Sequence, residues 1–297
     1  MTAVQDQPAT VDAPASVEVQ RAFPPPWLRR VGSWFLSLYA GLGLLYLFVP
    51  IAVIVAFSFN AEDSTYNIEW DGFTFDNWAD PFAEQGLVDA LVLSLKIAAI
   101  ATAAAVVLGG LVALALTRYR FQGSGFVNLF LVLPLTTPEI VLGASLASLF
   151  IARTYPSPVP DSRGFDAVLI AHIMFCVSFV SLTVKARLRG FDWTLEDAAM
   201  DLGAGPVRTF LKVTFPLMIP GILAAALLSF ALSLDDFIIT LFNAGDQTTF
   251  PIYIYGAAQR AIPPQIQVLS SMILFASVAI LVTGTLIGRR REAAATR

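Results

Sequence analysis

Six long apolar runs decide what this chain can fold into. They lie at about 33–59, 88–116, 126–151, 167–184, 217–242 and 268–288. A helix of about 20 apolar residues crosses the hydrocarbon core of a bilayer. A membrane barrel instead needs strands that alternate between polar and apolar residues, and these runs do not alternate. We therefore expect an all-α membrane protein with six transmembrane helices.

The composition excludes a soluble globular domain. Hydrophobic residues make up 57% of the 297 residues and charged residues 13%, whereas soluble domains are nearer one half and one quarter. Residues 1–26 are polar and non-periodic, which predicts a disordered tail. We expect a transmembrane domain at 27–291 and a second tail at 292–297. The lone His172 is interpreted as a packing or interfacial residue rather than a metal ligand.

The distribution of positive charge predicts the orientation of the spans. If both termini are inside, 14 of the 18 Lys and Arg residues lie in inner segments. The outer loop at 60–87 holds seven acidic residues and no Lys or Arg. Cytoplasmic loops of membrane proteins carry the excess of Lys and Arg. We therefore expect cytoplasmic termini and a cytoplasmic loop at 185–216.

The long inner loop at 185–216 contains two short helical patterns. We expect Thr194 to cap the first helix, with Asp197 as its capping-box acid. Gly203 follows as a C-cap glycine, and Pro206 opens the second helix at its first turn. Four apolar residues share one face of the first helix: Leu195, Ala198, Ala199 and Leu202. This face either packs on the spans, as in an ordinary connecting loop, or is offered to a partner.

The spacing within this loop resembles a known signature. ABC-importer permeases carry the pattern EAA-x3-G-x9-I-x-LP in the same position. The matching residues here are Asp197-Ala198-Ala199, Gly203, Val213 and Phe215-Pro216. Asp replaces Glu, Val replaces Ile and Phe replaces Leu, all mild changes. The resemblance implies the type I ABC importer permease fold.

The same resemblance implies how the chain is energised. In this family the loop is a coupling helix that docks on an ATPase subunit, which assigns that role to Asp197, Ala198, Ala199, Gly203 and Pro216. No Walker A motif occurs in the sequence, so we expect ATP and Mg to bind a separate chain. The implied partners are a second homologous permease, two ATPase subunits and an extracytoplasmic substrate-binding protein, with no nucleic acid. The implied location is the plasma (inner) membrane of a bacterium.

Three phrases resemble the spermidine/putrescine branch of that family. They are "LPLTTPEIVLGASL" at 133–146, "SLDDFIITLFNAGDQTTFPIYIYG" at 233–256 and "PPQI" at 263–266. Gln265 stands where that branch usually has Glu, so this phrase carries no negative charge here. The resemblance implies a polyamine substrate. The branch also includes permeases for aminophosphonates, ferric iron and thiamine, which remain alternatives.

Four ionisable residues lie within the apolar runs: Lys96, Glu139, Asp235 and Asp236. Such residues are costly in a membrane and by default indicate function. At about 1.5 Å per residue, all four fall between the middle and the outer third of the bilayer. One interpretation pairs Lys96 with an acid to tie spans together. The other leaves negative charge on a cation path.

Further candidates for that path are aromatic. Phe242, Tyr253 and Tyr255 lie at the outer end of the fifth run, where they can hold an amine by cation–π contact. They fit an interfacial aromatic belt equally well. Neighbouring residues on a helix diverge by about 100°, so Asp235 and Asp236 are not expected to face one pore together.

Two other classes of protein also place carboxylates inside a membrane. A proton-driven secondary transporter predicts an inverted internal repeat, and we find none. An intramembrane aspartyl protease needs two carboxylates that face each other, and adjacent residues on one helix diverge. Both classes are therefore less favoured than a transport subunit that is not itself an enzyme.

Overall fold

The computed structural model describes most of the chain. The described residues are 26–61, 67–152 and 163–295, of which 26–33 and 287–295 are described by backbone alone. The expected tail at 1–26 thus lies outside the described residues, apart from Pro26. Every regular element within the described ranges is a helix. Five helices are long and apolar enough to cross a membrane, or six if one bent pair counts as a span, which confirms the all-α membrane fold.

The first candidate span is α1 (Pro26–Phe57), which continues through Pro50. Most of it belongs to a unit of its own, Met1–Val53, whereas Ile54–Arg297 forms a second compact unit. All of the candidate site residues lie in the second unit.

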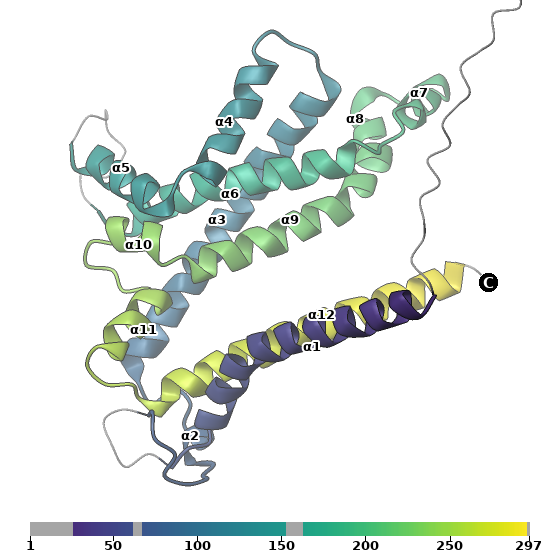
Figure 1. Cartoon of the computed structure of the whole chain (residues 1–297). Helices are drawn as coiled ribbons and strands as arrows, with labels where there is room; N and C mark the ends of the chain where they lie inside the picture. Colours follow the sequence, from purple (N-terminus) through teal and green to yellow (C-terminus); the bar gives the residue numbers. More distant parts are fainter. Residues whose placement is uncertain (1–25, 62–66, 153–162, 296–297) are drawn as a thin grey trace, which may run out of the picture. The chain divides into compact units, whose positions relative to one another are not determined.

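Three helices form the centre of the second unit (Figure 1). They are α3 (Gln85–Arg118), α6 (Phe165–Leu188) and α9 (Phe215–Asp235). Their shared core consists of Ala105, Ala113, Cys176, Val180, Val184, Leu188, Met218 and Ala225. Small residues let membrane helices approach closely. A Cβ added at Gly109 would lie 2.8 Å from the Cβ of Val180, so the α3–α6 contact requires glycine there.

The third apolar run is a bent pair rather than one helix. Its first part is α4 (Ser124–Thr136) and its second is α5 (Glu139–Ile151), with a bend of 107° between them. Proline disfavours the helical conformation of the residue before it, and Thr137 before Pro138 is extended. The regular helix assumed over 126–151 was therefore wrong, and so was the depth derived from it for Glu139.

The fifth run breaks near its C-terminal end and not near its start. Pro216 and Pro220 do not interrupt it, because α9 begins at Phe215 and continues through Pro220. The helix ends at Asp235 instead, and the chain resumes as the short α10 (Ile238–Asn243). A proline ring clashes with the carbonyl four residues earlier, and the turn just before Pro216, η1 (Phe210–Thr214), is a π-helix.

The inner loop contains the two expected short helices. They are α7 (Thr194–Asp201) and α8 (Pro206–Thr209), which leads into η1. Gly203 between them has φ +86°, the left-handed conformation that favours glycine. The expected cap is wrong by one residue, because Trp193 is the N-cap and Thr194 is the first helical residue, whose backbone N–H donates to Asp192 Oδ1 at 3.0 Å.

The end of the second unit that lies away from α7 is built from shorter elements. The helices there are α2 (Asp76–Ala79), α11 (Phe250–Ala258) and the start of α12 (Pro264–Ala295). Leu87 of α3 packs with Ile266 and Leu269 of α12, and residues of α11 cover this cluster. The cluster holds α11 against the end of α3, which places α11 beside the break after Asp235.

Candidate functional site

Asp235 and Asp236 occupy different environments although they are adjacent. Asp235 is the last residue of α9 and is exposed. Asp236 has left the helix with a ψ of 116°, and its side chain is only 7% exposed. The break in the helix therefore presents one carboxylate at the surface and buries the other.

The buried carboxylate of Asp236 starts the next helix. Its Oδ2 accepts a hydrogen bond from the backbone N–H of Thr240 at 2.9 Å and one from the Thr240 hydroxyl at 2.8 Å. The first N–H groups of a helix have no partner within that helix. A side-chain oxygen that accepts from them stabilises the helix start. Asp236 thus stabilises the beginning of α10.

His172 of α6 completes this buried network. Its Nε2 lies 3.2 Å from Asp236 Oδ2 and 2.9 Å from the Thr240 hydroxyl, and its Nδ1 lies 2.7 Å from Ser233 Oγ. The imidazole side chain is 3% exposed. Both ring nitrogens therefore have partners, and the ring ties α6 to residues on both sides of the break. His172 is more than the packing residue that its isolation in the sequence suggested.

The structure does not bring the four expected intramembrane charges together. Lys96 is exposed on α3, and within the described part of the chain it forms no ion pair. Glu139 is the exposed first residue of α5, just after the bend. The group that lies against Asp236 is thus His172 and not Lys96. A lone His inside an apolar run was the sequence signal, because ionisable residues are rare within spans.

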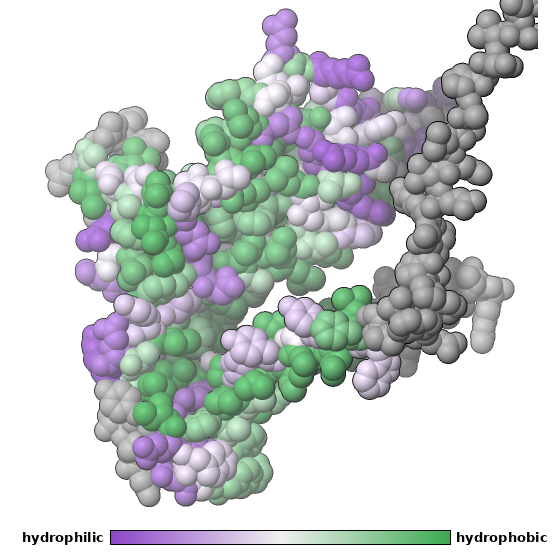
Figure 2. Space-filling model, in the orientation of Figure 1, coloured by the Kyte–Doolittle hydropathy of each residue, from purple (hydrophilic) through white to green (hydrophobic). Residues whose placement is uncertain are grey.

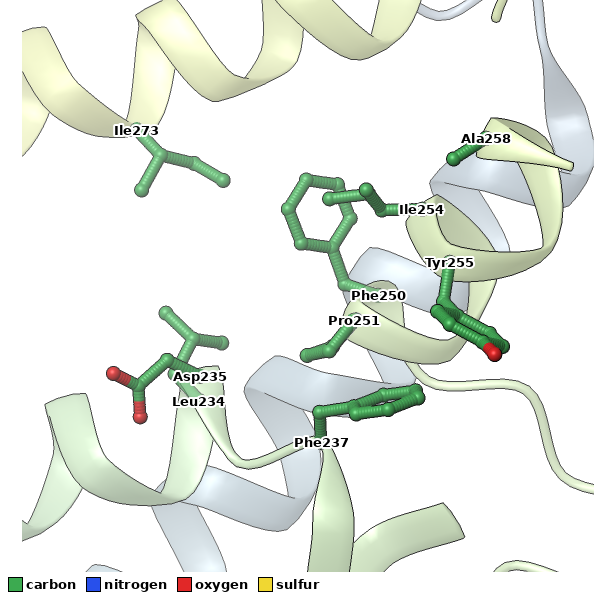
Figure 3. Close-up of a pocket in the computed structure, with 9 residues that line it drawn as sticks. All are labelled: Leu234, Asp235, Phe237, Phe250, Pro251, Ile254, Tyr255, Ala258 and Ile273. Carbon is green, nitrogen blue, oxygen red and sulfur yellow. The ribbon is translucent and has the colours of Figure 1, made fainter. Parts of the chain in front are cut away.

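The exposed Asp235 lines a pocket of about 560 Å³ between α9, α11 and α12. Figure 3 shows its carboxylate on the α9 side, whereas the rings of Phe237 and Tyr255 lie together on another side. The centroids of those two rings are 4.8 Å apart. The remaining lining residues are apolar: Leu234, Phe250, Pro251, Ile254, Ala258 and Ile273. The pocket wall is therefore almost entirely aromatic and aliphatic, and Figure 3 shows the Asp235 carboxylate at its edge, directed away from the rings.

The other two aromatic candidates lie elsewhere. Tyr253 packs in the outer cluster around Leu87, and burial together with the Glu84 carboxyl raises the pKa of its hydroxyl. The ring of Phe242 packs against Gly143 of α5, where an added Cβ would lie 3.1 Å from it. Of the three aromatic residues, the structure thus places only Tyr255 beside Asp235.

The inner loop presents an apolar face outward. Leu195 and Ala198 are exposed, and Leu202 is 90% exposed. Asp197 on the same helix is also exposed, whereas Pro216 is the second residue of α9. In Figure 2 hydrophilic residues gather around this end of the molecule, where α7 and α8 lie. The choice left open by the sequence thus resolves against packing on the spans.

A buried glutamate on the other side of α7 was missed in the sequence. Glu196 accepts hydrogen bonds from Arg118 at the end of α3 and from the Thr214 hydroxyl at the end of η1. Its side chain is 4% exposed. Nothing in the local pattern distinguishes it from its neighbour Asp197, because its partners lie 78 and 18 residues away. Across the described ranges no cluster of His, Cys, Asp and Glu suits a metal ion.

These features define a multi-pass membrane protein with a pocket near one end of its helices and an exposed short helix at the other. The chain belongs to the family described as "binding-protein-dependent transport system inner membrane component", whose model matches residues 105–292. It is therefore a permease subunit of an ABC importer and not an enzyme, and a separate subunit hydrolyses ATP.

Named relatives are similar over most of their length. The putrescine transport system permease protein PotI of Escherichia coli (strain K12) is 36% identical over 235 residues, which covers 78% of this chain and 83% of PotI. The spermidine/putrescine transport system permease protein PotC of Haemophilus influenzae is 35% identical over 248 residues, or 83% and 93% of the two chains.

Solved structures share the fold at low sequence identity. A bacterial ABC transporter involved in the import of alginate matches with a TM-score of 0.62 and 13% identity, covering 88% of this chain and 98% of that one. The inward-facing MetNI methionine transporter matches with a TM-score of 0.54 and 18% identity, over 68% and 94%. These matches confirm the expected type I permease fold.

Proposed function

We propose that this permease imports polyamines, and that Asp235 lines the path they take. The observation that carries the proposal is the exposed Asp235 carboxylate at the edge of a pocket with an aromatic and aliphatic wall. A polyamine is a methylene chain with ammonium groups. Its methylene groups suit the apolar wall, and an ammonium suits a carboxylate and the face of an aromatic ring.

The two adjacent carboxylates then have separate roles. Asp236 stabilises the start of α10 and lies against His172, so its Oδ2 already has protein partners. Asp235 is exposed at the pocket and forms no ion pair within the part of the chain that the structure describes. Its negative charge is therefore available to a cation. Names of the relatives that mention putrescine and spermidine support the same substrate class.

The complex around this chain follows from the family. A second homologous permease pairs with it, two ATPase subunits hold ATP and Mg and dock on α7, and a binding protein delivers the substrate outside. Both termini and the loop at 185–216 then face the cytoplasm of a bacterial cell. Transport proceeds by alternating access, in which closure of the ATPases rearranges the spans.

Uptake by the whole complex tests the substrate class. Cells that express all subunits are given radiolabelled putrescine, with unlabelled spermidine, thiamine, an aminophosphonate or ferric citrate as competitors. We expect putrescine uptake that only spermidine inhibits. Uptake of thiamine, aminophosphonate or iron in place of putrescine would reject the polyamine assignment, and the ABC permease class would stand.

A further inference from the structure

We propose that Glu196 is a positioning residue that transmits displacement of α7 to the spans α3 and α9. The inference rests on the proposed docking of α7 on the ATPase, but not on the identity of the substrate. Residues two apart on a helix point about 200° from each other. Glu196 and Ala198 are two apart, so the buried carboxylate and the exposed Ala198 lie on opposite sides of α7.

The Glu196 carboxylate joins three elements by its two oxygens. Oε2 accepts from Arg118, which is the last residue of α3, and Oε1 accepts from the Thr214 hydroxyl, which directly precedes α9. Arg118 is also held over the ring of Trp193, with its Cζ 5.6 Å from the ring centroid. One buried side chain thus links α7 to the ends of two spans.

The connection on the α9 side is a π-helical turn. Turns of this kind are uncommon and are frequently found at functional sites. Thr214 at the end of η1 is fully buried, and α9 continues from it to Asp235 at the pocket. A displacement of α7 is therefore transmitted to the start of α9, the helix that ends at Asp235. An exposed connecting loop without a buried contact to the spans would move without moving α9.

The test measures coupling in the complete reconstituted complex. Glu196→Gln keeps the size of the side chain and removes its charge, and Asp201→Asn removes an exposed carboxylate from the same helix. The readout is putrescine transported per ATP hydrolysed. We expect Glu196→Gln to lower this ratio by at least about fivefold, the lower end of typical allosteric couplings, whereas Asp201→Asn retains it.

Substitution of the exposed Arg118 tests the same link from its other side. Arg118→Met should lower the ratio as Glu196→Gln does, and Arg118→Lys, which keeps the charge, should restore most of it. The double variant should lose no more than either single variant, because residues that act through one contact are not additive. Additive losses would mean that the two residues act independently and would overturn the proposal.

A second readout needs no transported substrate. Ala258→Cys, which lines the pocket, is labelled in a Cys176→Ser background with and without ATP and vanadate. We expect ATP to change the labelling rate in the parent chain and not in Glu196→Gln. An unchanged ATP response, or failure of both Glu196→Gln and Arg118→Met to assemble, would make Glu196 a folding contact only. Lack of putrescine uptake in the parent complex would count against the polyamine assignment alone.

Discussion

Nε2 of His172 lies 3.2 Å from Oδ2 of Asp236, and both side chains are more than nine-tenths buried. This pair connects α6 to the break between α9 and α10. It also gives the buried carboxylate a polar partner. In an apolar environment a charge without a partner is costly.

Removal of His172 should destabilise the complex. His172→Ala removes one partner of the Asp236 carboxylate, which keeps its two hydrogen bonds from Thr240, at a cost of about 1.5–3 kcal/mol in the free energy of unfolding. Lys96→Met serves as the control, because Lys96 is exposed and forms no ion pair within the described residues. The measurement is the Tm and yield of the detergent-solubilised complex. A larger loss for Lys96→Met than for His172→Ala would contradict the assignment of His172 as the partner.

Two adjacent glycines of α3 should respond differently to the same substitution. An added Cβ at Gly109 meets Val180 at 2.8 Å, whereas at Gly110 nothing lies within 4 Å. Overpacking of this kind costs about 1–3 kcal/mol. We expect Gly109→Ala to lower the Tm and Gly110→Ala to leave it nearly unchanged. Equal effects would mean that α3 and α6 do not approach as the structure has them.

Gly203→Val should uncouple transport more than it impairs membrane insertion. Gly203 has φ +86°, and a residue with a Cβ loses about 1–2 kcal/mol in this conformation. The strain falls on the turn between α7 and α8, next to the proposed docking face. We expect normal amounts of the permease in the membrane with reduced co-purification of the ATPase and reduced uptake. Normal uptake with a normal yield of the complex would argue against docking through α7.

The orientation of the chain can be tested with single cysteines in a Cys176→Ser background. Glu69→Cys lies in the expected outer loop and Asp201→Cys in the inner loop, and both positions are exposed. An impermeant thiol reagent should label only Glu69→Cys in intact cells, and both positions after the cells are opened. Labelling of Asp201→Cys in intact cells would invert the topology.

The sequence predicts the helical spans well because the length of an apolar run is a local signal. The bend at Pro138 could have been predicted from the sequence, because proline restricts the conformation of the residue before it. The break after Asp235 was not, because it depends on hydrogen bonds from Thr240 and on His172, 64 residues earlier in the chain.

The same reason explains the partners that the sequence could not identify. Depth along straight helices placed Lys96 near the acids, but depth says nothing about which way a side chain points. In the sequence, Glu196 is not distinguished from the other acid in the first turn of its helix. Only the folded structure places Arg118 and Thr214 beside it. Contacts between distant segments decided the roles of these residues, and local patterns do not encode them.

The rate of putrescine uptake by Asp235→Asn tests the central claim most directly. The comparison uses complexes of equal yield and equal ATPase activity, with Asp235→Glu as the variant that keeps the charge and Asp246→Asn as an exposed control. A hydrogen bond to a charged group contributes about 1.5–3 kcal/mol, so Asp235→Asn should lose about tenfold or more in uptake. Asp235→Glu should retain part of it and Asp246→Asn all of it. Wild-type uptake by Asp235→Asn would show that the carboxylate is not on the path.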